Sequence, residues 1–570
     1  MSDQDVHPNK YSELLSICKY DIDTYITLYQ LKTENEEELN KIYKMIKKEL
    51  IDSKKYRPQD IIKDILDIIY YNNRYTKSYL YLAKLISDDY HVNEIEDFKS
   101  ILNFLFYKEY GIKLDKFDDF EKCKFENLDI HTDDTIYRAI MYNDLERFIY
   151  FIENEGFHQN QILICKLYPY TGKGYSLLEL CCYHGAVDCF KLLRTKFKSE
   201  ITQECLQFSF LGRNQEIMSE CLKYQVPDNR CMKYAIISHN IDFVTFLMNE
   251  YNMPIDLDYC EWHRNIESFL VYFDQTNDLN ECFIYSVSFN ITSLCEHFLS
   301  LGANINEINK HGETALHYAA EKNNKEIAEL LISCGANINE KNKYGETVLH
   351  YAAEKNNKEM AELLISCGAN INEKNKYGET VLHYAAEKNN KEMAELLISC
   401  GANINEKNKY GETVLHYAAE KNNKEIAGLF ISCGANINKK DNYTKTALHT
   451  AAEHNNKETA KLLISSGANI NEKGNIGETA LHYATRCNNK ETVELLISCG
   501  ANINEKNQYE ETALHYATRY CNKEMAELLI SLGANINEKN KYEETALHYA
   551  TMSNNISTVE LLISHGATTY

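Results

Sequence analysis

Eight histidines recur at a constant spacing of 33 residues, and a row of this kind could carry two kinds of chemistry. They are His317, His350, His383, His416, His449, His482, His515 and His548. Imidazoles bind metals such as zinc and act as general bases near neutral pH. Ligands of a shared zinc ion lie about 2 Å from it, whereas stacked helical units lie about 8–10 Å apart. Neighbouring histidines of the row therefore cannot share a metal ion.

Each of these histidines follows a threonine by three residues. The threonines are Thr314, Thr347, Thr380, Thr413, Thr446, Thr479, Thr512 and Thr545. This spacing brings the two side chains together at the start of a helix. We expect the imidazole to hydrogen-bond the threonine hydroxyl and neighbouring backbone, and so to lock a turn. The threonines and histidines are therefore predicted to be structural, and we predict no catalytic residue among them.

Cysteines form a second row at the same period. Cys334, Cys367, Cys400, Cys433 and Cys499 occupy one position, which Ser466, Leu532 and His565 fill in other copies. Chemistry at this position cannot depend on sulfur, and disulfides need Cα atoms within about 7 Å. The chain has 19 cysteines, an odd number. We expect reduced, mostly buried thiols and no metal or cofactor.

The repeated unit explains how these side chains are positioned. A short polar turn ends at Gly345, where glycine permits a positive φ. Thr347 is a natural N-cap for a first helix with a small apolar face. The second helix is predicted from about residue 358 to residue 366, and Gly368 follows as its C-cap. Helices this short are unstable alone, so burial between neighbouring units must stabilise the array.

The period and the Thr-(Ala/Val)-Leu-His-x-Ala core resemble the ankyrin repeat, in eight copies over residues 301–570. The resemblance implies an all-α solenoid of helix-turn-helix units joined by short hairpin turns. It also implies the structural role of the histidines and a concave, protein-binding surface.

The chain before the array carries the same pattern in blurred form from residue 131 to residue 300. Gly174–Gly185 aligns without a gap on Gly312–Asn323. This block resembles the degenerate ankyrin-like domain of unknown function that precedes arrays in expanded protist ankyrin families. Lys173 lies in a glycine-rich turn, but the flanking residues of a phosphate loop are missing, so we interpret it as a repeat turn.

Residues 1–130 show no repeat, and their apolar spacing predicts several amphipathic helices. Asp118, Asp119, Asp133 and Asp134 could form acid/base or metal pairs. We predict solvated charges or helix caps instead.

The concave surface predicted by the resemblance consists of turn tips and the exposed side of the first helix. The matching residues are Lys343, Tyr344, Glu346, Tyr351, Lys376, Tyr377, Glu379, Tyr384, Lys409, Tyr410, Glu412 and Tyr417. Tyrosine suits such a surface because it is large, rigid and amphipathic. Recent duplication would copy these residues whether or not they bind, so both interpretations stay open. Later copies differ, and Thr444, Glu510 and Glu543 replace the turn glycine, which costs strain if φ is positive.

Composition narrows the function classes. A net charge of −23 argues against binding to nucleic acid or to anionic membranes. No apolar run approaches the ~18 residues of a membrane span. We predict a non-catalytic, cytoplasmic or nuclear scaffold or adaptor that binds a protein partner. The alternative is an ankyrin-targeted enzyme or regulatory domain with its activity in residues 1–130. The last repeat lacks a clear polar cap, which suggests self-association through that repeat.

Overall fold

The structure, a computed structural model, describes residues 7–53, 55–95, 98–116, 120, 135–154, 156–169 and 172–568. It divides into two compact units, residues 1–304 and 305–570. Helices dominate both units, so the all-α solenoid prediction is confirmed. The four aspartates considered as acid/base pairs (Asp118, Asp119, Asp133 and Asp134) lie outside the described residues. No described helix is long and apolar enough to cross a membrane.

The first unit begins with a layer of amphipathic helices without repeat pattern. Its elements are α1 (His7–Tyr29), α2 (Glu36–Ile46), the π-helical turn η1 (Lys47–Ile51), α3 (Pro58–Asp67), the 3₁₀ turns η2 (Ile68–Tyr70) and η3 (Asn73–Tyr75), α4 (Thr76–Asp89) and α5 (Ser100–Tyr110). Asn35 caps α2 by accepting from two backbone N–H groups. Pro58 starts α3, where its fixed φ suits the first helical position. Ile61, Ile65 and Leu82 are fully buried in this layer.

The rest of the first unit is a series of helix pairs. They are α6 (Ile136–Met141) with α7 (Leu145–Glu153), α8 (Leu177–His184) with α9 (Val187–Lys196), α10 (Gln203–Gly212) with α11 (Gln215–Cys221), α12 (Asn229–Ile237) with α13 (Ile241–Tyr251), α14 (Leu257–Trp262) with α15 (Ile266–Thr276), and α16 (Leu279–Ser286) and η4 (Val287–Phe289) with α17 (Thr292–Ser300). A small antiparallel pair, β1 (Ile162–Leu163) and β2 (Tyr175–Ser176), precedes α8.

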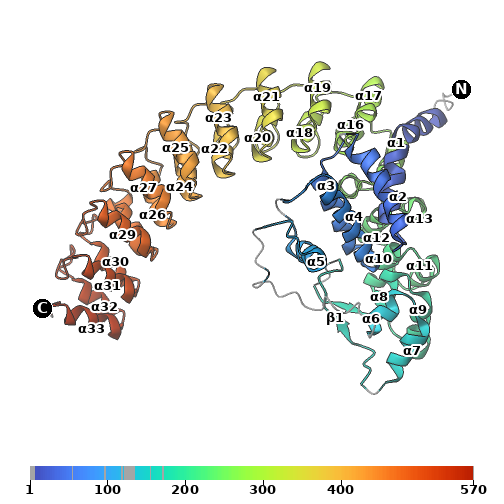
Figure 1. The fold of residues 1–570 in the computed structure, drawn as a ribbon, viewed down its shortest axis with the longest axis horizontal. Helices are drawn as coiled ribbons and strands as arrows, with labels where there is room; N and C mark the ends of the chain where they lie inside the picture. Colours follow the sequence, from blue (N-terminus) through green and yellow to red (C-terminus); the bar gives the residue numbers. More distant parts are fainter. Residues whose placement is uncertain are drawn as a thin grey trace. The chain divides into compact units, whose positions relative to one another are not determined.

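The second unit repeats one helix pair eight times. Its pairs are α18 (Ala315–Glu321) with α19 (Lys325–Ser333), α20 (Val348–Glu354) with α21 (Lys358–Ser366), α22 (Val381–Glu387) with α23 (Lys391–Ser399), α24 (Val414–Glu420) with α25 (Lys424–Ser432), α26 (Ala447–Glu453) with α27 (Lys457–Ser465), α28 (Ala480–Arg486) with α29 (Lys490–Ser498), α30 (Ala513–Arg519) with α31 (Lys523–Ser531), and α32 (Ala546–Met552) with α33 (Ile556–Ser564). A 3₁₀ turn, η5 (Asn475–Gly477), precedes α28. Figure 1 shows the first helix of a pair on the concave side of this unit for α18, α20, α22, α24 and α26, in yellow-green to orange. We call the first helix of each pair the inner helix and the second helix the outer helix.

Packing between pairs supplies the stability that such short helices lack. In the second repeat Leu349, Ala352 and Ala353 of the inner helix are buried, together with Met360 and Leu364 of the outer helix. The two alanines permit close approach of neighbouring inner helices. The core is therefore a continuous layer along the array, as expected for a solenoid.

A hairpin turn joins each repeat to the next, and the turns hydrogen-bond to one another. Asn342 Oδ1 accepts from the backbone N–H groups of Tyr344 and Glu346, which closes the turn. The backbone N–H of Lys376 in the following turn donates to the Tyr344 carbonyl at 2.7 Å. This bond brings successive turns into a row beside the inner helices, where the predicted partner-binding residues lie.

Candidate functional site

The threonine and histidine of each repeat form one hydrogen-bonded unit at the start of the inner helix. Thr347 is the N-cap of α20, with extended backbone and a reciprocal capping box to His350. The Thr347 backbone N–H donates to His350 Nδ1 at 3.1 Å, and the Thr347 hydroxyl lies 3.0 Å from the same nitrogen. Since Nδ1 accepts the backbone N–H, the ring proton is on Nε2. In the first repeat His317 Nε2 correspondingly donates to the Glu346 carbonyl of the next turn at 3.4 Å.

Burial keeps the histidines of the first seven repeats neutral. It lowers the pKa of His350, His383 and His449 to about 4. The pKa values of His317, His416, His482 and His515 are lowered for the same reason. Six of the eight rings link their own threonine to the carbonyl of the next turn: His317, His350, His416, His449, His482 and His515. In these repeats both ring nitrogens serve the fold. The described part of the chain contains no group of three or more His, Cys, Asp or Glu side chains placed to hold a metal ion.

The inner-helix tyrosine joins two repeats through its hydroxyl. Tyr351 donates to the Glu313 carboxylate of the preceding repeat at 2.6 Å and accepts from Asn342 Nδ2 at 3.0 Å. Asn342 Nδ2 also donates to Glu346 at 2.8 Å. Burial, followed by the bond to Glu313, raises the pKa of Tyr351. We call this set the Asn–Glu–Tyr network. It recurs around Tyr384, Tyr417, Tyr516 and Tyr549.

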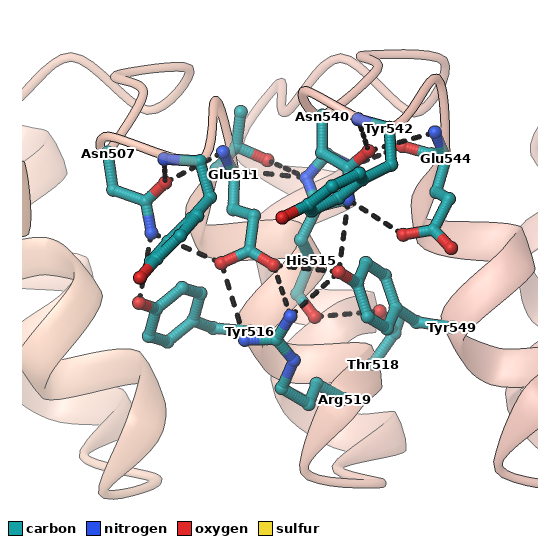
Figure 2. A network of polar contacts seen from close by, with 12 residues as sticks. Asn507, Glu511, His515, Tyr516, Thr518, Arg519, Asn540, Tyr542, Glu544 and Tyr549 are labelled. Atoms are coloured by element: carbon teal, nitrogen blue, oxygen red, sulfur yellow. Dashed lines mark hydrogen bonds and ion pairs between the residues drawn. The ribbon is translucent and has the colours of Figure 1, made fainter. Parts of the chain in front are cut away.

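Figure 2 shows the network in the last two repeats, where an arginine joins it. Tyr549 donates to Glu511 at 2.7 Å and accepts from Asn540 at 3.0 Å. The Arg519 guanidinium pairs with the Glu511 carboxylate and donates to the Tyr549 hydroxyl at 2.7 Å. Glu511 is almost fully buried, so the cation compensates a carboxylate that burial would otherwise destabilise.

The fifth repeat interrupts the network. Thr450 stands at the tyrosine position and Lys445 at the glutamate position. Glu412 of the fourth repeat consequently lacks the tyrosine donor that Glu313, Glu346 and Glu379 have, and burial raises its pKa. Lys445 Nζ instead pairs with Glu453 at 2.6 Å and lies 5.0 Å from the centre of the Tyr483 ring.

The predicted partner-binding residues therefore fall into two groups. One group takes part in the network: Glu346, Tyr351, Glu379, Tyr384, Glu412 and Tyr417. The other group is exposed at the turns: Lys343, Tyr344, Lys376, Tyr377, Lys409 and Tyr410. The turn position also carries exposed tyrosines in three later repeats. We call the six of them the tip tyrosines: Tyr344, Tyr377, Tyr410, Tyr443, Tyr509 and Tyr542, with 41 to 66% of each side chain exposed.

The cysteines differ between the two units. All eleven described cysteines of the first unit are buried, but the seven of the second unit are exposed. The prediction of mostly buried thiols is therefore wrong for the array. Cys367 directly follows the end of α21 as its C-cap residue, outside the packed face of the helix. The structure places no two described cysteines in a disulfide.

The turns that lack glycine keep the same left-handed backbone. Thr444, Glu510 and Glu543 have φ of 61°, 60° and 63°. Because φ is positive at these three residues and each has a Cβ, the backbone strain expected for a residue other than glycine is present at all three turns. Ile476, the middle residue of the 3₁₀ turn η5 of the sixth repeat, also has a positive φ of 51°.

The last repeat carries both buried and exposed apolar side chains. Leu562 is fully buried in its own repeat. Met552 and Ile556 are 76% and 70% exposed. An apolar contact of this repeat with another molecule would therefore use Met552 and Ile556, whereas Leu562 belongs to the core.

Comparisons with known proteins agree with this geometry. A family model described as ankyrin repeats, in three copies, matches residues 283–375, 367–441, 422–507 and 499–569. A model described as a domain of unknown function, DUF3447, matches residues 197–272. No curated protein matches the chain.

Proposed function

Because the chain belongs to the ankyrin-repeat family, whose repeats are protein–protein interaction modules, we propose that it is a scaffold or adaptor that binds a protein partner through the concave side of residues 305–570. The observation that supports this most directly is the row of tip tyrosines. Large aromatic side chains held on hydrogen-bonded turns offer contact area with little loss of conformational entropy. The proposed role is non-catalytic, uses no cofactor, and is exercised in the cytoplasm or the nucleus.

The two groups of predicted residues have different parts in this proposal. The exposed lysines and tyrosines of the turns, such as Lys376 and Tyr377, contact the partner. The network residues, such as Glu379 and Tyr384, fix the spacing of the turns and support the exposed turn residues from below. A partner that spans several repeats then contacts the same lysine and tyrosine pair in each of these turns. This regular spacing favours an extended or repetitive protein ligand.

The test compares capture of proteins from extract by the full chain and by two triple variants. Changing Tyr344, Tyr377 and Tyr410 to Ser should reduce the recovered partner at least about 10-fold, because three aromatic contacts are lost. Changing Glu359, Glu392 and Glu425 to Gln, at exposed positions of the outer helices, should leave recovery unchanged. Mass spectrometry identifies the proteins, and circular dichroism verifies the fold. Undiminished recovery with the tyrosine variant would contradict the proposal.

A second copy of the chain is a further proposed partner at the last repeat, because Met552 and Ile556 are strongly exposed there. Changing both to Glu should convert a concentration-dependent oligomer into a monomer in light scattering. A wild-type chain that is monomeric at every concentration would remove this part of the proposal.

A further inference from the structure

The helix pairs of the first unit have corner residues with a left-handed backbone between the first and second helix. We use the name corner residues for those of the last four pairs, Arg213, His239, Arg264 and Asn290, whose φ angles are 53°, 51°, 53° and 54°. Asparagine adopts this conformation readily, but arginine does so at a steric cost. Strained residues persist where the surrounding contacts fix them and often mark functional positions.

Each corner residue reaches the N-terminal helical layer. Arg213 Nη2 donates to the Tyr29 carbonyl at 3.2 Å. The His239 ring stacks on the Tyr29 ring, with centres 4.2 Å apart and planes at 24°. Asn290 Nδ2 donates to the Lys55 carbonyl at 2.9 Å. Three of the four corner residues therefore contact α1 or the loop before α3.

Arg264 makes the only charged pair between a corner residue and the helical layer among the described residues. Its Nε lies 3.4 Å from the Asp64 carboxylate, and its guanidinium lies 4.8 Å from the centre of the Tyr56 ring. The same guanidinium donates to the Ser288 carbonyl at 2.6 Å. The pair is half-buried, with 14% of the Arg264 side chain and 29% of the Asp64 side chain exposed. Removing one partner would leave the other charge partly shielded from water, which is costly.

The N-terminal helical layer also donates hydrogen bonds to backbone carbonyls at or next to the corner residues. Gln30 Nε2 donates to the His239 carbonyl at 2.7 Å, and the Tyr56 hydroxyl donates to the Phe289 carbonyl at 2.7 Å. Carbonyls at the ends of helices lack partners within their helix. Because both sides supply donors and acceptors, the contact is a matched interface.

The array uses the corresponding corners differently. Its corner residues are asparagines in seven of eight repeats, with Cys521 in the other: Asn323, Asn356, Asn389, Asn422, Asn455, Asn488 and Asn554. From the second repeat on these residues are exposed. Long basic or imidazole side chains at the corners therefore distinguish the block that the helical layer covers.

We propose that residues 197–272, which match the domain of unknown function, are a docking platform for the chain's own N-terminal helices, with Arg213, His239 and Arg264 as the recognition residues. The ligand is the helical layer of residues 7–116, which presents Tyr29, Tyr56 and Asp64. This goes beyond the proposed scaffold function, since it assigns a role to the degenerate block and to the N-terminal region.

The test cuts the intact chain at a protease site inserted between residues 116 and 135. The variant combines Tyr29→Ala with Arg264→Gln. The matched control combines Tyr20→Ala, exposed on the same helix α1, with Arg230→Gln, exposed on α12. After cleavage, the wild-type and control fragments should co-elute in size-exclusion chromatography at micromolar concentration. The variant should show a Kd at least about 100-fold higher, because a buried aromatic anchor and a half-buried ion pair are lost.

Wild-type fragments that separate while both stay folded would overturn the proposal, as would variant fragments with the wild-type Kd. If a fragment fails to fold after cleavage, the proposal is tested by backbone amide hydrogen exchange in the uncleaved variant. Exchange should rise both in α1 and in α12–α15, with the array unchanged. Faster exchange in α1 alone, with residues 197–272 still protected, would also overturn the proposal.

Discussion

The two units use the same helix pair in opposite ways. In the first unit the polar side chains that make specific contacts lie at the corners. There Arg213, His239 and Arg264 contact the N-terminal helices. In the second unit the corners carry exposed asparagines, and the specific polar contacts lie at the other end of the pair, in the turns. The same helix pair thus carries two kinds of surface. The corners of the first unit contact the chain's own N-terminal helices, and the turns of the second unit form the proposed partner-binding surface.

The units should also differ in their response to acid. Seven buried histidines in the array have a lowered pKa, three of them to about 4. In the first unit burial lowers the pKa of His239 and His263 to about 3. It also raises the pKa of the Asp21 and Asp64 carboxyls. A neutral buried imidazole favours the fold above the unfolded pKa of about 6.5, and stability is lost as pH falls from there toward the folded pKa. The raised aspartates act in the opposite direction.

The largest expected effect is therefore selective unfolding of the array between pH 6.5 and pH 4. Each of the three histidines with a pKa of about 4 contributes a loss of about 2–3 kcal/mol by the end of this window. The single tryptophan, Trp262, reports on the first unit by fluorescence, and far-ultraviolet circular dichroism reports on both. Circular dichroism should fall at a higher pH than the fluorescence change. A tryptophan transition that comes first, or together with the dichroism, would contradict this expectation.

The next largest effect should distinguish the covered tyrosine from an open one. Changing Tyr29 to Ala should lower the free energy of unfolding of the first unit by about 3–5 kcal/mol, because a buried aromatic ring is removed. Changing the tip tyrosine Tyr377 to Ala should cost the second unit less than about 0.5 kcal/mol, as for other exposed sites. Urea unfolding followed by both signals measures the two values. Equal losses of free energy of unfolding for the two variants would contradict the distinction between the covered Tyr29 and the exposed Tyr377.

A smaller effect should show that the network joins repeats. Changing Tyr384 to Phe removes the hydroxyl between Glu346 and Asn375 and should destabilise the array by about 1–2 kcal/mol. The converse change, Thr450→Tyr, offers Glu412 the donor that it lacks and should stabilise the array by about 1 kcal/mol. Chemical denaturation measures both. If the two changes have the same sign, the network does not couple the repeats.

The sequence predicted what local spacing determines. The outer helix expected near residues 358–366 is α21, Lys358–Ser366. The threonine and histidine three residues apart meet because one helical turn separates them. The thiols were misjudged because Cys367 lies one residue past the end of its helix, where helical periodicity no longer determines burial.

Contacts between different repeats, and between the N-terminal helices and the helix pairs, were harder to predict. Tyr351 bonds Glu313, 38 residues earlier, so sequence spacing did not pair them. A signal existed, since the asparagine, glutamate and tyrosine positions change together to Asp441, Lys445 and Thr450 in the fifth repeat. For the N-terminal helices there was no such signal: Gln30 and His239 are 209 residues apart and occur in no repeat. The division of the first 300 residues at residue 130 stays a prediction about folding units.

The smallest expected effect concerns the turns that open the second unit to partners. Glu510 has a φ of 60°, in the conformation that Gly345 and Gly378 adopt at the same position. A left-handed backbone costs a residue with a Cβ about 1 kcal/mol, so Glu510→Gly should stabilise the array by about that amount. Part of the gain is offset by the greater freedom of glycine in the unfolded chain. Changing Glu505, a half-buried turn residue with φ outside the left-handed region, to Gly should destabilise instead, also because its ion pair with Lys473 at 2.8 Å is lost. Thermal unfolding of both variants gives the comparison, and a loss of stability in Glu510→Gly would show that the turn had relaxed without strain.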